Sequence, residues 1–89
     1  MKSRYSLDEL EELAREMTRK ALEDYIVPES YRANLTLGIS IEGENRSFEL
    51  YISGERPSDA VVISKATLDR NTGLGTVEVF GLEKKDASR

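Results

Sequence analysis

The sequence contains no cysteine, no histidine and no tryptophan among its 89 residues. Without cysteine the chain forms no disulfide, no thiolate metal site and no thiol nucleophile. Without histidine it lacks an imidazole metal ligand and the side chain that serves most often as a general base. Zinc sites, Ser-His-Asp triads and Cys-His dyads are therefore excluded for this chain alone, and we expect neither a metal nor a cofactor.

Long apolar runs are missing as well. Hydrophobic residues make up 38% of the chain and charged residues 34%, which is too apolar for a disordered chain and too polar for a membrane protein. No run approaches the ~20 apolar residues that a membrane-spanning helix needs, and the N-terminal residues lead directly into a charged segment instead of a signal sequence. We therefore expect one cytoplasmic domain without a membrane partner.

The charge balance is acidic and uneven. Thirteen Lys and Arg residues stand against 17 Asp and Glu residues, which gives a net charge of −4. Residues 1–27 carry −2, residues 28–64 carry −3 and residues 65–89 carry +1. An acidic middle argues against nucleic acid as a partner, because phosphate binding needs a basic surface, and it favours a protein with a basic surface.

The clearest predicted element is a helix from about Leu7 to Ile26. Ser6 and Glu9 have the spacing of a capping box at its start, and Pro28 follows its end. Apolar residues repeat at helical spacing in one stripe, which we expect to be buried. The stripe consists of Leu7, Leu10, Leu13, Ala14, Met17, Ala21 and Tyr25.

After a short connection at residues 29–32 the period of the pattern changes to two. Apolar and polar residues alternate over residues 35–42 and 47–53, and the residues between them are typical of a turn. We predict a β-hairpin whose buried face carries Leu35, Leu37, Ile39 and Ile41 from the first strand and Phe48, Leu50 and Ile52 from the second.

Two further strands are predicted at residues 60–68 and 75–82, separated by a turn over Asp69 to Gly73. Each of them has two possible faces. In the third strand the buried set is Val62, Ser64, Ala66 and Leu68, or else Val61, Ile63, Lys65 and Thr67. In the fourth strand it is Val77 and Val79, or else Thr76, Glu78, Phe80 and Leu82. Residues 83–89 read as a polar tail outside a single domain of residues 1–82.

A helix followed by four strands with short links predicts an α+β fold of two layers. The N-terminal helix packs on one face of a four-stranded antiparallel meander sheet. This order resembles the cystatin-like and PepSY-type arrangements, and the turn at Asp69, Thr72 and Gly73 before a short last strand is similar to PepSY endings. The resemblance spans most of the chain and implies the fold alone.

Three patterns suggest chemistry and fail on inspection. Residues 69–73 begin like a calcium loop but have glycine at the fifth position and Phe80 at the twelfth. Gly73-Leu74-Gly75 lacks the third glycine and the following helix of a phosphate-binding loop. Glu42 and Glu49 could approach each other across the first hairpin, but a solvated polar face explains them better. We therefore expect no catalytic residue and no enzyme.

The sheet face turned away from the helix is the most informative surface. The first two strands place small polar side chains and Tyr51 there, and the last two turn apolar side chains outward in either register. An exposed apolar cluster would mark an association surface, whereas a curled sheet would bury both faces in part. The predicted partner-binding residues are Glu42, Glu44, Glu49, Tyr51, Ile63 and Phe80.

Four functions remain open from the sequence. The one we favour is a small non-catalytic protein-binding module of the inhibitor, immunity or regulator type, which binds through the sheet face or an edge strand. The first alternative is a homo-oligomeric, dimeric accessory or structural protein that uses the same surface. A small-ligand carrier and an enzyme completed by its partner are the other two.

Overall fold

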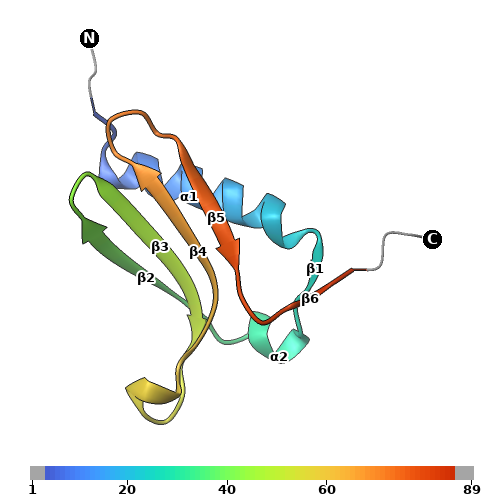
Figure 1. The fold of residues 1–89 in the computed structure, drawn as a ribbon. Helices are drawn as coiled ribbons and strands as arrows, with labels where there is room; N and C mark the ends of the chain where they lie inside the picture. The colour runs from blue at the N-terminus through green and yellow to red at the C-terminus, as the bar shows by residue number, and fades with distance from the viewer. Residues whose placement is uncertain (1–3, 86–89) are drawn as a thin grey trace.

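Figure 1 shows the computed structural model of the chain, which describes residues 4–85. The sheet has the strand order β2-β3-β4-β5 with antiparallel neighbours, and α1 packs against one of its faces. The predicted α+β fold is therefore confirmed. Along the chain the elements are α1 (Leu7–Leu22), β1 (Tyr25–Ile26), α2 (Glu29–Arg32), β2 (Leu35–Glu42), β3 (Asn45–Ile52), the 3-10 turn η1 (Pro57–Asp59), β4 (Val61–Asp69), β5 (Gly75–Val79) and β6 (Glu83–Lys84).

The start of α1 follows the predicted capping box. The backbone N–H of Glu9 donates to Ser6 Oγ at 3.1 Å, and the backbone N–H of Ser6 donates to Glu9 Oε1 at 2.8 Å. The predicted end of the helix at Ile26 is wrong. The helix ends at Leu22, because Tyr25 and Ile26 form β1 and pair with another strand instead.

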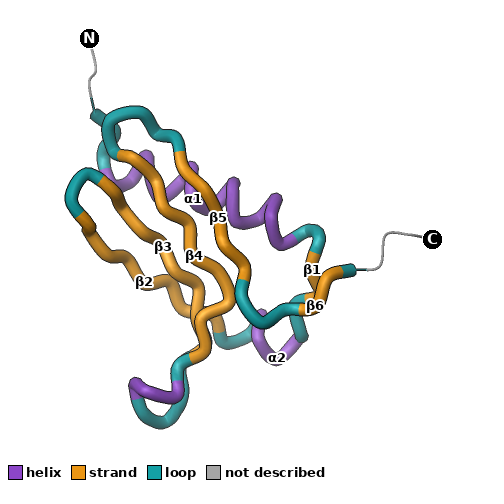
Figure 2. Tube along the Cα trace, viewed as in Figure 1, coloured by secondary structure: helices purple, strands orange, loops and turns teal. Residues whose placement is uncertain are grey.

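That other strand is β6, which the sequence pattern did not indicate. Tyr25 pairs with Lys84 and Ile26 with Glu83, and the Lys85 N–H donates to the Asp24 carbonyl at 2.8 Å. Figure 2 shows this small second sheet beside the end of α1. Residues 83–85 therefore belong to the fold and not to a tail, whereas residues 86–89 lie outside the described part of the chain.

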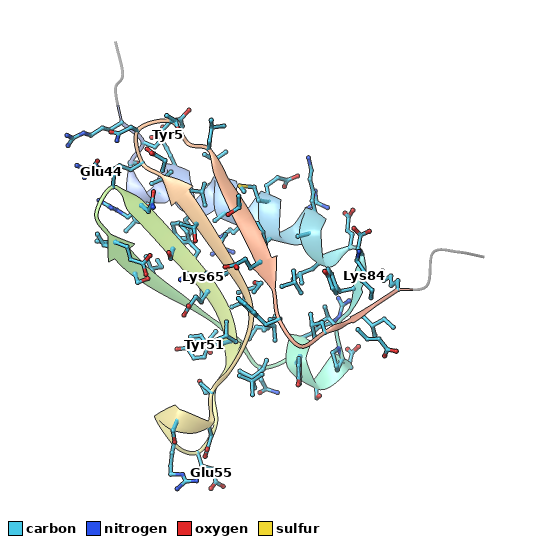
Figure 3. All side chains as sticks on the ribbon, in the orientation of Figure 1. Tyr5, Glu44, Tyr51, Glu55, Lys65 and Lys84 are labelled. Atoms are coloured by element: carbon cyan, nitrogen blue, oxygen red, sulfur yellow. The ribbon has the colours of Figure 1, made fainter. Side chains whose placement is uncertain are left out.

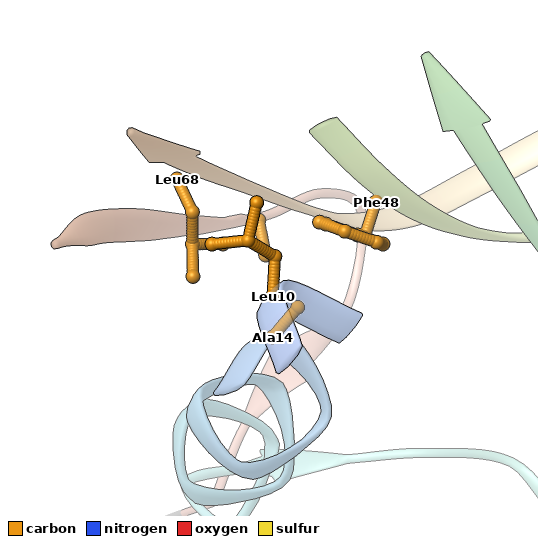
Figure 4. Close-up of a cluster of buried hydrophobic side chains, with 5 residues drawn as sticks. Leu10, Ala14, Phe48 and Leu68 are labelled. Carbon is orange, nitrogen blue, oxygen red and sulfur yellow. The ribbon is translucent and has the colours of Figure 1, made fainter. Parts of the chain in front are cut away.

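The core lies where α1 crosses β3 and β4 (Figure 4). Small side chains on both elements allow a close approach of helix and sheet, since Ala14 on the helix and Ala66 on β4 are both buried. The predicted helix stripe is correct only in part: Thr18 is buried in it, whereas Leu7 and Leu13 stay largely exposed. The buried cluster consists of Leu10, Ala14, Phe48, Ala66 and Leu68.

β4 follows the first of its two predicted registers over residues 64–68 and departs from it before residue 64. Ser64, Ala66 and Leu68 lie completely buried on the helix side, as in the first of the two predicted registers. The pairing with β3 then shifts between Leu50 and Tyr51, so β4 contains an extra residue there, as in a β-bulge. Without the shift Ile63 would pair with Tyr51 on the polar face; the extra residue turns it to the helix side, where it is fully buried. Val61 pairs with Ile52 at the start of the strand and is 48% exposed. In β5 Val77 packs on the core, which settles the face of that strand.

Candidate functional site

The helix covers only part of the sheet. A helix is about 10–12 Å wide with its side chains, whereas four strands at about 4.8 Å spacing span about 19 Å. The main contacts of α1 are with β3, β4 and β5, and β2 forms the edge of the sheet at the left of Figure 1. The helix-side face of β2 is therefore left partly open.

Apolar side chains lie on that open face. Ile39 is 44% exposed and Ile41 is 65% exposed, although both point to the same side of the sheet as the buried Phe48. A polar residue would be expected at a merely solvated position of an edge strand. The exposed isoleucines therefore mark a surface suited to contact with another apolar group.

A groove of about 240 Å³ continues this face toward the helix. Its apolar floor is formed by Ala14, Leu37, Phe48 and Leu50, and charged side chains of α1 form one rim. Pockets for small molecules usually enclose 300–1,000 Å³, so this groove suits one or two side chains of a bound segment better than a whole ligand. We call this groove, together with Ile39 and Ile41, the β2 surface.

The charges on the helix rim are paired with one another. Arg15 Nη2 lies 2.7 Å from Glu11 Oε2, and Arg19 Nη2 lies 2.6 Å from Glu16 Oε2. The hydrogen bond and the charge of Glu11 raise the pKa of Arg15, and those of Arg19 lower the pKa of Glu16. The rim therefore presents no large excess of either sign to a segment in the groove.

The backbone of β2 offers a second means of contact. The turn between β2 and β3 contains two residues, with Gly43 at φ 64°, so Glu42 and Asn45 close the hairpin as a hydrogen-bonded pair. Antiparallel pairing alternates from residue to residue, which directs the N–H and C=O groups of the odd-numbered residues of β2 away from β3. These residues are Leu35, Leu37, Ile39 and Ile41.

Natural edge strands usually carry lysine, proline or a bulge that prevents pairing with another chain. None of these occurs in β2, which pairs without a register shift over all eight residues and has Glu42 as its only charged residue. The edge is therefore open for a further strand. The opposite edge strand, β5, is only five residues long.

The predicted site residues Glu42, Glu49 and Tyr51 lie on the other face of the sheet, which carries mainly polar side chains. Glu42 pairs with Asn45 and Glu49 with Gly38, so the two carboxylates do not stand opposite each other as an acid–base pair would. Lys65 lies between them: it pairs with Glu49, and its Nζ is 3.9 Å from Glu42 Oε2. Figure 3 shows Tyr51 and Lys65 on this face.

The side chain of Tyr51 packs over Gly38 in the edge strand β2. A Cβ atom at Gly38 would lie 3.2 Å from Cε1 of Tyr51, so the tyrosine ring packs closely over the middle of β2. The ring is half-buried. Tyr51 is therefore the predicted site residue that lies nearest to the open edge strand.

The other predicted site residues do not join this surface. Glu44 lies in the first turn and accepts hydrogen bonds from Asn71 Nδ2 at 3.1 Å and Arg70 Nε at 2.9 Å, which lower its pKa. Ile63 is completely buried and presents no surface to a partner, because of the register shift in β4. Phe80 is 39% exposed and follows β5. An exposed cluster that includes Ile63, one of the two alternatives left open by the sequence, therefore does not form.

The sequence analysis left both the sheet face and an edge strand open as binding surfaces, but it assigned Ile39 and Ile41 to the buried face of the hairpin. The signal that could have found these two residues is the width of the sheet. Four apolar positions alternate along β2, and only one long helix is predicted to cover a sheet that is wider than a helix. Because one helix about 10–12 Å wide cannot cover four strands that span about 19 Å, at least one strand of the sheet had to remain uncovered on the helix side.

Within residues 4–85 no group of three or more acidic side chains is placed to hold a metal ion. In the same range no helix is both long enough and apolar enough to cross a membrane. Comparisons of the chain with protein-family models, curated proteins and solved structures found no match.

Proposed function

We propose that this chain is a non-catalytic protein-binding module that accepts a strand of its partner along β2. The observation that supports the proposal is the combination of an unprotected edge strand with exposed Ile39 and Ile41 beside an apolar groove. Adding a strand to an exposed sheet edge is a common mode of protein recognition, in which backbone hydrogen bonds supply affinity and alternate side chains supply specificity.

Binding would use the two components of the β2 surface together. The partner strand pairs with the outward N–H and C=O groups of the odd-numbered residues of β2. Every second side chain of that strand then points to the helix side, where it covers Ile39 and Ile41 and reaches the groove. The hydrophobic contacts stabilise the complex, and the backbone pairing sets the register.

The acidic side chains outside this surface have a different role in the proposal. Glu42 and Glu49 lie on the polar face next to the edge and add to the net charge of −4. Such a charge accelerates the approach of a basic partner more than it strengthens the final complex. Small inhibitors, immunity proteins and regulators are the classes of module that fit this mode of action.

A site-specific crosslinking experiment tests the proposal. A photo-reactive phenylalanine analogue replaces Ile41 in the full chain, and the matched control carries it at Leu74, which is 74% exposed and lies in the turn before β5. We expect an adduct with one defined protein from position 41 only, and we expect the additional change Ile39→Lys to abolish it. Equal crosslinking from both positions, or none from position 41, would refute binding along β2.

A further inference from the structure

We propose that the strand accepted by β2 is β2 of a second copy of this chain, paired antiparallel about a two-fold axis at Gly38. The two sheets then join into one continuous sheet with both α1 helices on the same side. This inference rests on the proposed function, since it uses the same edge, and it identifies the partner. Most closed homo-oligomers are symmetric in this way, with the same patch contributed by both subunits.

The side chains of β2 are self-complementary in this register. Residues directly opposite each other in an antiparallel pair point to the same face of the sheet. With Gly38 on the axis, Leu35 faces Ile41 of the second copy and Leu37 faces Ile39 of the second copy. The exposed isoleucines of each copy are thereby covered by apolar side chains of the other.

A shift of this register by one residue would remove the match. It would place each apolar residue of β2 opposite a polar residue or glycine of the second copy, and it would put the two helices on opposite faces. The alternation of the β2 sequence therefore favours pairing with itself in one orientation. An unrelated strand has no such built-in match.

The backbone groups fit the same register. Leu35, Leu37, Ile39 and Ile41 direct their N–H and C=O groups to the open edge, and in this pairing each of them faces another member of the same set. The pairing of β2 with β3 uses the even-numbered residues and stays intact. Dimer formation therefore requires no rearrangement of the hairpin.

Within the two paired strands neither charge nor bulk opposes the contact, and the repulsion between two copies of net charge −4 acts at long range, where salt screens it. Glu42 is the only charged residue of β2, and it lies opposite Asn34 of the second copy, so no like charges meet. At the axis two Gly38 residues approach each other with no side chain between them. The ring of Tyr51, which packs over Gly38, then covers the junction from the polar face in both copies.

The size of the contact predicts a weak but specific dimer. A strand of eight residues is about 26 Å long at ~3.3 Å per residue. The edge that meets the second copy consists of the β2 backbone and its side chains without the helix layer, so the buried area lies below the about 1,200–2,000 Å² of stable interfaces. We expect a dissociation constant on the order of micromolar or weaker.

Sedimentation equilibrium of the full chain at concentrations from about 1 μM to about 1 mM tests the dimer. We expect the mass to rise from 10.0 kDa toward twice this value. Ile41→Lys introduces the charge by which natural edges avoid pairing, and we expect it to weaken the dimer on the order of tenfold or more. The matched control Leu74→Lys makes the same chemical change at another exposed position and should leave the dimer unchanged. Thermal melting confirms that both variants fold.

Hydrogen exchange gives a readout specific to this geometry. The amides of Leu37, Ile39 and Ile41 should gain protection as the protein concentration rises, whereas those of Gly38 and Ser40 should be protected at every concentration. A monomer at the highest concentration, or a dimer that persists in Ile41→Lys, would overturn the inference. If the crosslink from position 41 then joins a different protein, the proposed function stands without the dimer. If no crosslink forms, both fail.

Discussion

Two buried serines on neighbouring strands provide a test of the packing, because their hydroxyl groups differ in hydrogen bonding. Ser64 on β4 and Ser47 on β3 are both completely buried. Ser64 Oγ has no hydrogen-bond partner in the described structure, whereas Ser47 Oγ lies 3.5 Å from both Thr67 Oγ1 and Glu42 Oε1. The same substitution, Ser to Ala, should therefore change the free energy of unfolding differently at the two positions.

The expected magnitudes follow from the cost of burying a hydroxyl. An unpaired buried hydroxyl costs about 1 kcal/mol, at the lower end of the range for buried polar groups, and Ser64→Ala removes that cost. Alanine is less favourable than serine in a strand by a few tenths of a kcal/mol, so the net gain at Ser64 is about 0.5–1 kcal/mol. Ser47→Ala has the same strand penalty and also loses two long hydrogen bonds, so it should cost about 1 kcal/mol. The difference between the two variants is about 1.5–2 kcal/mol, and the strand penalty cancels in it.

Urea denaturation of both variants and the parent chain measures this difference. Equal slopes of free energy against urea confirm that the variants unfold in the same way. In thermal melting the difference corresponds to roughly 6–16 °C for a domain of this size. If Ser64→Ala destabilises the chain as much as Ser47→Ala does, the Ser64 hydroxyl has a hydrogen-bond partner in solution and the reasoning is wrong.

Two further predictions concern the core and the turns. Leu10→Ala removes a side chain that is 1% exposed and should lower the free energy of unfolding by about 3 kcal/mol. Leu13→Ala, at 37% exposure, should lower it by about 1 kcal/mol. Urea denaturation measures both values, and equal values would contradict the assigned helix face. Glu44→Gln should lower stability at neutral pH, because hydrogen bonds from the second turn lower the pKa of Glu44 in the folded chain. That contribution is present above the unfolded pKa and is lost as the pH falls through the folded pKa, so the two proteins should become equally stable in acid. A constant difference across that range would disprove the role of the charge.

The parts of the fold that sequence patterns predicted are those with a local cause. The capping box of Ser6 and Glu9 acts within one helical turn, and the alternation over β2 and β3 defines two faces without reference to the rest of the chain. The turn with Gly73 at φ 76° likewise depends on a few neighbouring residues. Each of these features was placed correctly to within a residue or two.

The features that patterns did not predict depend on pairing between distant segments. Residues 25–26 leave the helix because residues 83–84 supply a partner strand. Ile63 and Ser64 are consecutive residues, yet both are completely buried, because the pairing of β4 with β3 shifts by one residue. The alternation within either segment alone does not contain this information, since consecutive strand residues normally point to opposite faces.

The sequence by itself determined the class of the fold, the strand order and the lack of cysteine and histidine chemistry, because composition and short-range periodicity carry that information. Only the tertiary structure decided which side chains remain available to a partner. That depends on how one helix about 10–12 Å wide is placed on a wider sheet, which covers β4 and leaves β2 open. The candidate binding surface therefore lies at Ile39 and Ile41, on the face opposite the one that the sequence favoured.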